Sequence, residues 1–303
     1  MNSRQSGVAL LAVLVVSVIL AVLMGYATSR MQQRLALAED AKEALHELAR
    51  VNAKLNELTY LLATQRITAA GVSKGNNKVG LAREGGQWLH PLTGDELRAD
   101  GYAYEASGVK FSIQNEAGLI SVNTPTQYWL KRWLSEHGYG VSEQNRLTAT
   151  LADYADGDNW RRPGGKEVSD EVIGNYLLQS CNELWRIEAW VALLEKHPYF
   201  LDHCSLSRVS KININAVPNG LWRVLWPKAA DKVAEARSSD QWIKLDNALL
   251  QFAPGLLTLS SDLYTRLGGR SFIIKVWGES TSLSVRVELN DGKLNSYTVR
   301  ARR

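Results

Sequence analysis

The sequence predicts an α+β fold, in which a long N-terminal helix, transmembrane in its first part, packs on a small antiparallel sheet, and a large all-α domain is inserted. Three observations predict it. An apolar run begins at Gly7 and passes into a helical stripe that reaches Leu62. Short alternating segments stand near both ends of the remaining chain, and a tryptophan-rich segment of helical periodicity separates them. The expected boundaries are a leader at 1–7, the helix at 8–68, the sheet domain at 69–115 and 268–303, and the inserted domain at 116–267.

The apolar run from Gly7 to Met24 follows a leader with one charge, Arg4. About seventeen residues span roughly 26 Å, enough to cross a thin bilayer, so the transmembrane part is placed at 8–26. A secretory signal is cut after its apolar core, whereas the processing site suggested here, between Gly7 and Val8, precedes the core. Cleavage there leaves the apolar helix on the mature protein. A signal anchor that is never cut is the alternative.

Beyond the run, apolar residues recur every three or four positions, which predicts one continuous helix from Val8 to about Thr68, roughly 90 Å long. The stripe consists of Met31, Leu35, Ala38, Ala41, Leu45, Leu48, Val51, Leu55, Leu58 and Leu62. We expect the first half of the helix in lipid and the second half on a globular domain. A separate coiled-coil stalk is the alternative, but the pattern lasts only about four heptads and includes alanines.

The sheet domain is predicted from short segments at both ends of the remaining chain. A loop rich in glycine, asparagine and lysine covers Ala70–Gly86. The expected strands are Tyr102–Glu105, Val109–Gln114, Phe272–Trp277, Leu283–Leu289 and Leu294–Val299, with a hairpin turn at Asp291-Gly292. We expect these separated strands to form one sheet.

The inserted segment contains eight of the ten tryptophans, among amphipathic runs. They are Trp129, Trp133, Trp160, Trp185, Trp190, Trp222, Trp226 and Trp242. Aromatic residues at helical spacing usually form a packed interior. We therefore expect an α-domain that closes over its own core.

Charge and motifs restrict the function. The net charge of +4 is mild and the basic residues are scattered, so binding to nucleic acid is not indicated. The chain has no G-x-S-x-G, no H-E-x-x-H and no phosphate-binding glycine loop, and its five histidines lie far apart. An enzyme is not expected. Arg4 before the apolar run and Arg30 and Arg34 after it orient the helix only weakly, with the short leader on the cytoplasmic side.

The leader resembles the prepilin signal of type IV pilins and type II secretion pseudopilins. This resemblance implies that a prepilin peptidase cuts after Gly7 and N-methylates Val8. Most members carry a glutamate at the fifth mature position, which is Ala12 here. A subunit without that carboxylate has no partner for the terminal amine of a neighbour, and so suits only the end of a filament.

Five further motifs occur in the order found in the general secretion pathway protein K family of minor pseudopilins. They are NEAGLISVNTPT, LADYADGDNWRRPGGKE, NELWRIEAW, KININAVPNGLWRVL and GGRSFIIKVWGE. The resemblance covers almost the whole chain and implies a pseudopilin fold with an inserted helical domain. It also implies a non-enzymatic subunit that forms a tip complex with I- and J-type minor pseudopilins. The subunit would span the bacterial inner membrane once, contact the secretion platform there, and place most of its chain in the periplasm as it primes the pseudopilus for protein export.

In that oxidising compartment, Cys181 and Cys204 allow a single disulfide. A pair of buried thiols that never meet is the alternative.

The carboxylates Asp153, Asp156, Asp158 and Glu167 form the most chemically suggestive cluster. Closely spaced hard oxygens with no nearby histidine or cysteine suit calcium better than zinc, and K-type pseudopilins bind calcium in this domain. However, the loop is short and contains Arg161 and Arg162. Direct ion pairing with these arginines can replace a metal. A solvated, partly ion-paired loop is therefore the alternative, and the one we favour.

The segment KININAVPNGLW permits a second function. Asn213 and Asn215 before Pro218 resemble the opening of a helix-hairpin-helix module, as in membrane-anchored DNA receptors. That module needs a glycine-rich hairpin, which the sequence after Trp226 lacks. An asparagine-rich turn that caps a helix is the simpler interpretation.

Overall fold

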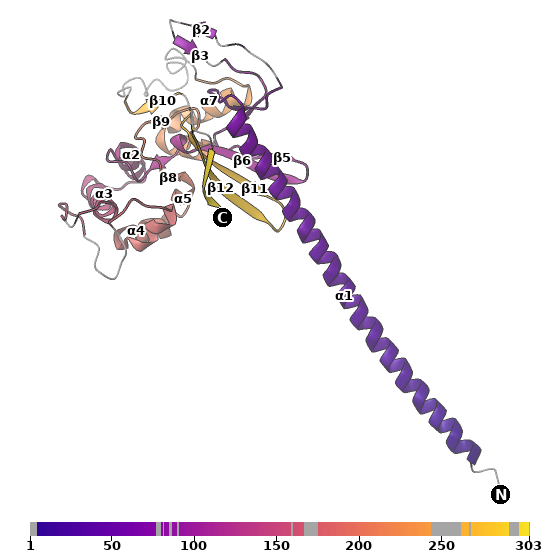
Figure 1. Cartoon of the computed structure of the whole chain (residues 1–303). Coiled ribbons are helices and arrows are strands. Elements are labelled where there is room, and N and C mark those ends of the chain that lie inside the picture. Colours follow the sequence, from indigo (N-terminus) through magenta and orange to yellow (C-terminus); the bar gives the residue numbers. More distant parts are fainter. Residues whose placement is uncertain are drawn as a thin grey trace.

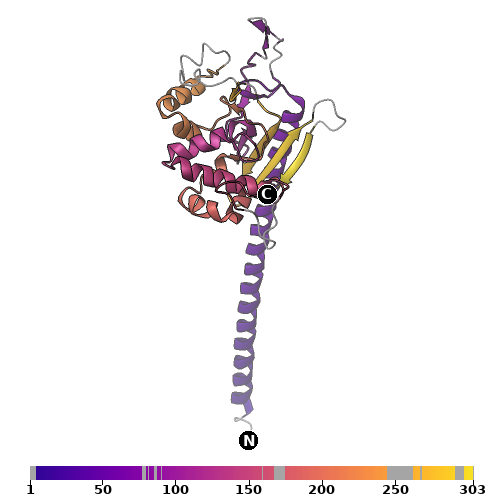
Figure 2. The ribbon, with the colours of Figure 1, turned by 90° about the vertical axis from the view of Figure 1, so that its left-hand side faces the viewer.

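The computed structural model shows one long helix that carries a globular head (Figure 1). The structure describes residues 5–76, 80, 82–84, 87–89, 91–158, 160–166, 175–243, 262–266, 268–290 and 297–302. The head has two hydrophobic cores, one between the helix and a sheet and one within a group of shorter helices. Figure 2 shows the helical group on one side and the sheet with the long helix on the other.

Helix α1 runs without a break from Gln5 to Thr64, as the stripe predicts. It ends four residues before the predicted Thr68. The reason is local: Ile67 pairs with Val72 in an isolated antiparallel bridge, and the Thr68 N–H donates to the Gly71 carbonyl. The chain therefore reverses direction directly after the helix.

Only the C-terminal part of the α1 stripe packs on the head. Leu58 is fully buried, whereas Leu35 is 59% exposed and Leu45 is 67% exposed. The expectation that the whole second half of the helix is covered is therefore wrong, because the sheet begins to cover α1 only at Glu47. Figure 1 shows the uncovered part as a rod that projects from the head.

A five-stranded antiparallel sheet packs on α1. Its order is β13-β12-β11-β6-β5, with bounds β5 Tyr104–Ala106, β6 Val109–Asn115, β11 Ser271–Trp277, β12 Ser282–Leu289 and β13 Tyr297–Arg302. Strand β11 pairs with β6 in the register Ile274 to Ile113, so segments far apart in sequence form one sheet, as expected. Alternate side chains, including Phe111, Ile113 and Ile274, enter the core shared with α1. The predicted turn at Asp291-Gly292 lies outside the described residues.

The segment predicted as the loop Ala70–Gly86 contains strands, which corrects that expectation. Strand β1 (Gly71–Ser73) pairs with β4 (Glu96–Arg98), and β2 (Ala82–Glu84) pairs with β3 (Gln87–Leu89). Gly71 has φ +150°, and a Cβ there would stand 1.9 Å from the Leu97 carbonyl oxygen. Glycine therefore permits the close pairing here, and Val72 beside it is fully buried.

The second core lies within residues 120–243, with Leu263 and Tyr264 packed against it. Its helices are α2 Tyr128–Glu136, α3 Val141–Ala155, α4 Glu188–Lys196, α5 Phe200–His203, α6 Asn219–Leu225 and α7 Pro227–Ser238, with the 3-10 helix η2 Cys181–Arg186. Another 3-10 helix, η1 Glu116–Gly118, precedes this core. Two short parallel strand pairs join the helices, namely β7 Ile120–Ser121 with β8 Cys204–Ser205, and β9 Ile212–Asn213 with β10 Tyr264–Thr265.

Six of the eight tryptophans of this segment are buried, and Trp133, Trp190 and Trp222 are fully so. Trp160 is 83% exposed and Trp185 is 40% exposed, so the expectation of a common core is wrong for these two. Trp160 follows the end of α3 and lies in a loop, where no helical face directs its side chain inward.

Candidate functional site

The projecting part of α1 is the first candidate functional element. Among the described residues it is the one helix long and apolar enough to cross a membrane, with a mean hydropathy of 2.7 over its best window. The Ser17 hydroxyl donates to the Val13 carbonyl, and the Thr28 hydroxyl donates to the Met24 carbonyl, both at 2.8 Å. The polar atoms of these side chains are therefore satisfied within the helix, as lipid requires.

The residues at the predicted processing site lie at the start of this helix. Gly7 and Val8 fall within α1, and Ala12 lies on an exposed turn of it. The first acidic residue in the chain is Glu39. Arg30 donates from Nε to the Tyr26 hydroxyl at 2.9 Å and lies over the Tyr26 ring. Tyrosine and arginine are both typical of the membrane–water boundary, so this turn is where the boundary is expected if α1 crosses a membrane.

Glu47 fixes the head to α1, a role that the sequence analysis missed. Its carboxylate accepts hydrogen bonds from the Ser280 N–H at 2.8 Å, the Ser280 hydroxyl at 2.6 Å and the Thr281 N–H at 2.8 Å, in the turn between β11 and β12. These hydrogen bonds, that from the Ser280 hydroxyl foremost, lower the pKa of Glu47. A Cβ at Gly278 would stand 2.2 Å from the carboxylate, so the turn needs glycine there. The sequence signal that could have revealed this role is the position of Glu47, a charged residue one helical turn before Val51 on the buried stripe.

A buried ion pair joins the two cores. Arg237 of α7 donates from Nη1 to Asp100 at 3.0 Å, and both side chains are 2% exposed. Asp100 belongs to the sheet side of the head, where it bridges to β6, and it also accepts from Arg98 at 2.5 Å. Burial lowers the pKa of Arg237 to about 10, which leaves it charged at neutral pH. The helical group is therefore held against the sheet by the Arg237–Asp100 ion pair, which is almost fully shielded from water.

Arg237 also organises the asparagine-rich segment. It donates to the carbonyls of Val217 at 2.8 Å and Ile214 at 3.0 Å. The Asn215 side chain donates to the Ile243 carbonyl at 2.8 Å and accepts from the Ile243 N–H at 3.1 Å. These hydrogen bonds connect three stretches of chain: the asparagine-rich segment, α7 and the chain at Ile243.

The predicted helix cap in this segment is wrong. The N-cap of α6 is Pro218 and makes no side-chain cap, and Asn213 and Asn215 are each 3% exposed. Their amides are used internally rather than at the helix end. Helix α7 then begins at Pro227, directly after Trp226, without the glycine-rich hairpin of a helix-hairpin-helix module.

The polar face of the sheet meets the helical group across a cleft of about 700 Å³. Lys275 of β11 pairs with Asp202 of α5 at 3.2 Å, and Arg286 of β12 pairs with Glu116 at 2.8 Å. These ion pairs connect the sheet to segments at the edge of the helical group.

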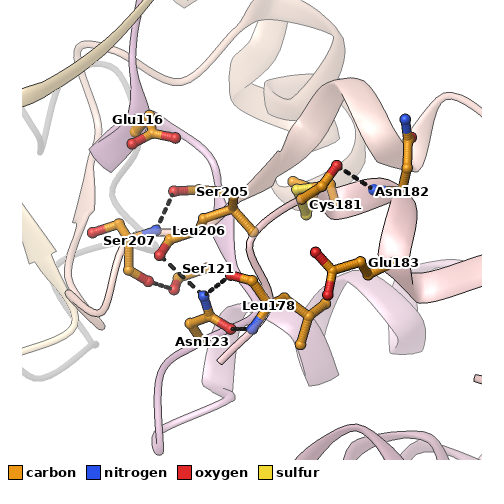
Figure 3. The surroundings of a disulfide bond; sticks show 12 residues. Glu116, Ser121, Asn123, Leu178, Cys181, Asn182, Glu183, Ser205, Leu206 and Ser207 are labelled. Carbon is orange, nitrogen blue, oxygen red and sulfur yellow. Dashed lines mark hydrogen bonds between the residues drawn. A yellow bond between two sulfur atoms is a disulfide. The ribbon is translucent and has the colours of Figure 1, made fainter. Parts of the chain in front are cut away.

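Two cysteines that form a disulfide are among the residues that line this cleft. Figure 3 shows the surroundings of the disulfide. Cys181 and Cys204 are joined, with their Cα atoms 6.2 Å apart. Beside them, the Asn123 amide donates to the Leu178 carbonyl at 2.9 Å and to the Leu206 carbonyl at 3.3 Å, as Figure 3 shows. The disulfide and Asn123 therefore connect the same two stretches of chain.

The carboxylate cluster after α3 is an ion-paired loop in the described residues. Arg162 donates from Nη1 to Asp153 at 2.8 Å and also to Asp156. Asp158 accepts from the Trp160 N–H at 2.8 Å, and the predicted ligand Glu167 lies outside the described residues. No group of three histidine, cysteine or acidic residues that could bind a metal occurs in the described part of the chain. Asp153 and Asp156, as arranged, do not fit calcium, because one guanidinium nitrogen contacts both.

The fold has a counterpart among solved structures. It is similar to a chain in the crystal structure of the GspK–GspI–GspJ complex from the type 2 secretion system of enterotoxigenic Escherichia coli, with a TM-score of 0.54. The match covers 89% of this chain and 98% of that chain, at 11% sequence identity. No protein-family model matches the sequence, and no curated protein matches it significantly. The predicted combination of a long apolar helix, an antiparallel sheet and a helical region is confirmed.

Proposed function

We propose that this chain is a K-type minor pseudopilin, which stands at the tip of a type II secretion pseudopilus. The observation that carries the proposal is a helix of 60 residues whose apolar first part projects from a two-core head with the fold of a chain in the GspK–GspI–GspJ complex. Its role is to initiate assembly of the filament for export of folded proteins. That role is structural rather than catalytic.

The N-terminus supports the place at the tip. After cleavage between Gly7 and Val8, the terminal amine of a pilin subunit needs a buried carboxylate on its neighbour. This chain offers Ala12 at that position and no acidic residue before Glu39. A subunit above this chain would have no carboxylate to pair with its terminal amine, whereas this chain can itself stand above other subunits. It therefore occupies one end of the filament.

The partners follow from the same arrangement. The I- and J-type minor pseudopilins contact the head and the projecting part of α1, where Met31, Leu35 and Leu45 are exposed beyond the membrane boundary at Arg30. The prepilin peptidase and the secretion platform act at the inner membrane. The helix crosses that membrane once and the head lies in the periplasm.

The mass and N-terminal residue of the protein extracted from membranes test the class. We expect N-methylated Val8 as the first residue, and we expect Gly7→Val to remain uncut because any side chain at the scissile position obstructs the peptidase. Gln5→Ala is a matched control in the leader that should be cut. A mature protein that begins at Met1, or a Gly7→Val variant that is cut normally, contradicts the proposal.

Position in the filament needs a separate measurement. Cysteine pairs between neighbouring subunits should crosslink this chain at one end of a purified pseudopilus. Periodic crosslinks along the shaft would contradict the tip position while leaving the pseudopilin class intact.

A further inference from the structure

The loop that follows α3 is built around one carboxylate. Asp153, in the last turn of α3, is fully buried. Its two oxygens accept from the backbone N–H of Arg162 at 3.2 Å each, and Oδ1 also accepts from Nη1 of Arg162 at 2.8 Å. The same Nη1 donates to Asp156, the C-cap of the helix. Arg162 therefore provides hydrogen bonds to both oxygens of Asp153 and to one oxygen of Asp156, together with a positive charge beside the two carboxylates.

The rest of the loop closes tightly around this group. Gly165 donates from its N–H to the Arg162 carbonyl at 2.8 Å, and Arg161 donates from Nε to the Gly165 carbonyl at 2.8 Å. A Cβ at Gly165 would stand 1.9 Å from Oδ2 of Asp153. The turn Arg-Arg-Pro-Gly-Gly thus lies directly against the carboxylate, in a position that a larger residue at 165 would prevent.

The electrostatics explain why a cation is required here. A buried carboxylate without a partner is strongly unfavourable, and two carboxylates that share one site repel each other. Hydrogen bonds to Asp156 and Asp153 raise the pKa of Arg162 above its ordinary value, so its charge is permanent. A divalent cation coordinated by the same oxygens would solve the same problem. Arg162 and a metal cannot both neutralise Asp153 and Asp156, because Nη1 of Arg162 already contacts both carboxylates.

We propose that Arg162 is a built-in cation that holds residues 160–166 against the end of α3 in place of a divalent metal, and that removal of its guanidinium converts Asp153 and Asp156 into a calcium-binding pair. The loop is then independent of calcium in the natural chain. This inference rests on the loop contacts alone and does not depend on the assembly role.

The test uses the full chain in detergent and follows thermal unfolding with either EDTA or about 1 mM CaCl₂. The natural protein should show the same Tm in both conditions. Arg162→Met, which keeps the aliphatic stem, should lower the Tm in EDTA by about 5–10 °C. Calcium should restore most of that loss, with half-saturation between about 0.1 and 1 mM, whereas magnesium at the same concentration should not.

Three further variants separate the cation from general damage. Arg161→Met is the matched control, because within the described residues the Arg161 side chain donates to a carbonyl and to no carboxylate, and it should not gain a calcium response. Arg162→Lys keeps the charge and should stay independent of calcium. The double variant Arg162→Met/Asp153→Asn should lose the rescue, because Asp153 is then neutral.

Two results would overturn the inference. One is a natural protein whose Tm falls in EDTA and that binds calcium stoichiometrically by isothermal titration calorimetry. The other is an Arg162→Met variant whose Tm does not change on addition of calcium and that shows no calcium binding by isothermal titration calorimetry. If Arg162→Met does not fold in EDTA, its recovery in calcium supports the inference, and failure to fold in both conditions contradicts it.

Discussion

Between residues 10 and 46, helix α1 buries no side chain, whereas between residues 47 and 64 it buries six. The six are Glu47, Val51, Leu55, Leu58, Thr59 and Leu62. Both parts are rich in leucine and alanine, and together they form one continuous helix. The difference lies in what covers them: the chain's own sheet covers the second part, and the described residues of the head leave the first part exposed. Apolar residues in the packed part contribute to folding, and under the proposed function those in the projecting part contribute to insertion and assembly.

The largest expected effect lies in the head, at the ion pair between the cores. Arg237→Met should lower the free energy of unfolding by about 3–5 kcal/mol, because it leaves Asp100 buried with one cation fewer. Chemical denaturation of the head measures the loss. Arg146→Met, which removes an exposed pair with Glu143 at 3.6 Å, should cost less than about 1 kcal/mol. Equal losses of unfolding free energy in the two variants would contradict the assignment of the Arg237–Asp100 ion pair as the connection between the two cores.

The next effect compares the two parts of α1 directly. Leu58→Ala should cost about 2–5 kcal/mol of unfolding free energy, because it opens a cavity against the sheet. Leu35→Ala, on the projecting part, should change the same quantity by less than about 0.5 kcal/mol. A comparable loss at Leu35 would mean that the head covers more of α1 than the structure shows.

A local effect is expected at Glu47. Glu47→Gln replaces one carboxylate oxygen, an acceptor, by an NH₂ group, which places N–H groups against the N–H donors of Ser280 and Thr281. The backbone amides of Ser280 and Thr281 should therefore exchange hydrogen faster. Glu57→Gln, more exposed on the same helix, is the control. Because the folded pKa of Glu47 is lowered, its stabilisation is complete above the unfolded value of about 4.5 and disappears as pH falls through the folded value. Unchanged exchange in Glu47→Gln would show that the contact does not fix the turn.

The smallest effect is a pH slope. Burial lowers the pKa of His197 and of His203, with His137 contributing to both. The folded state therefore binds fewer protons than the unfolded state, and stability should fall as pH decreases through the unfolded value of about 6.5. His197→Gln/His203→Gln should flatten the slope of unfolding free energy between pH 7.5 and 5.5. An unchanged slope in the double variant would contradict the assignment.

Periodicity predicted the elements but not the connections between them. The stripe of α1 and the alternation of Val109, Phe111 and Ile113 predicted the long helix and strand β6, because burial on one face leaves a period in the sequence. The pair between Asp100 and Arg237 spans 137 residues and leaves no period, so no local signal could reveal it. The carboxylate cluster was recognised by composition, but the geometry of Arg162 depends on a turn at Gly164 and Gly165. The end of α1 was misplaced because the strand at Val72 lies within a glycine-rich run.

The most direct test of the central claim is sedimentation velocity on the protein without residues 1–30, alone and with the soluble domains of I- and J-type minor pseudopilins. The projecting part from Met31 onward and the head are kept, so recognition should survive without the membrane. We predict a soluble protein that forms a complex with one copy of each chain. Strong self-association with no shift on addition of the partners would contradict the tip role, because an apolar helix face without its partners associates with itself.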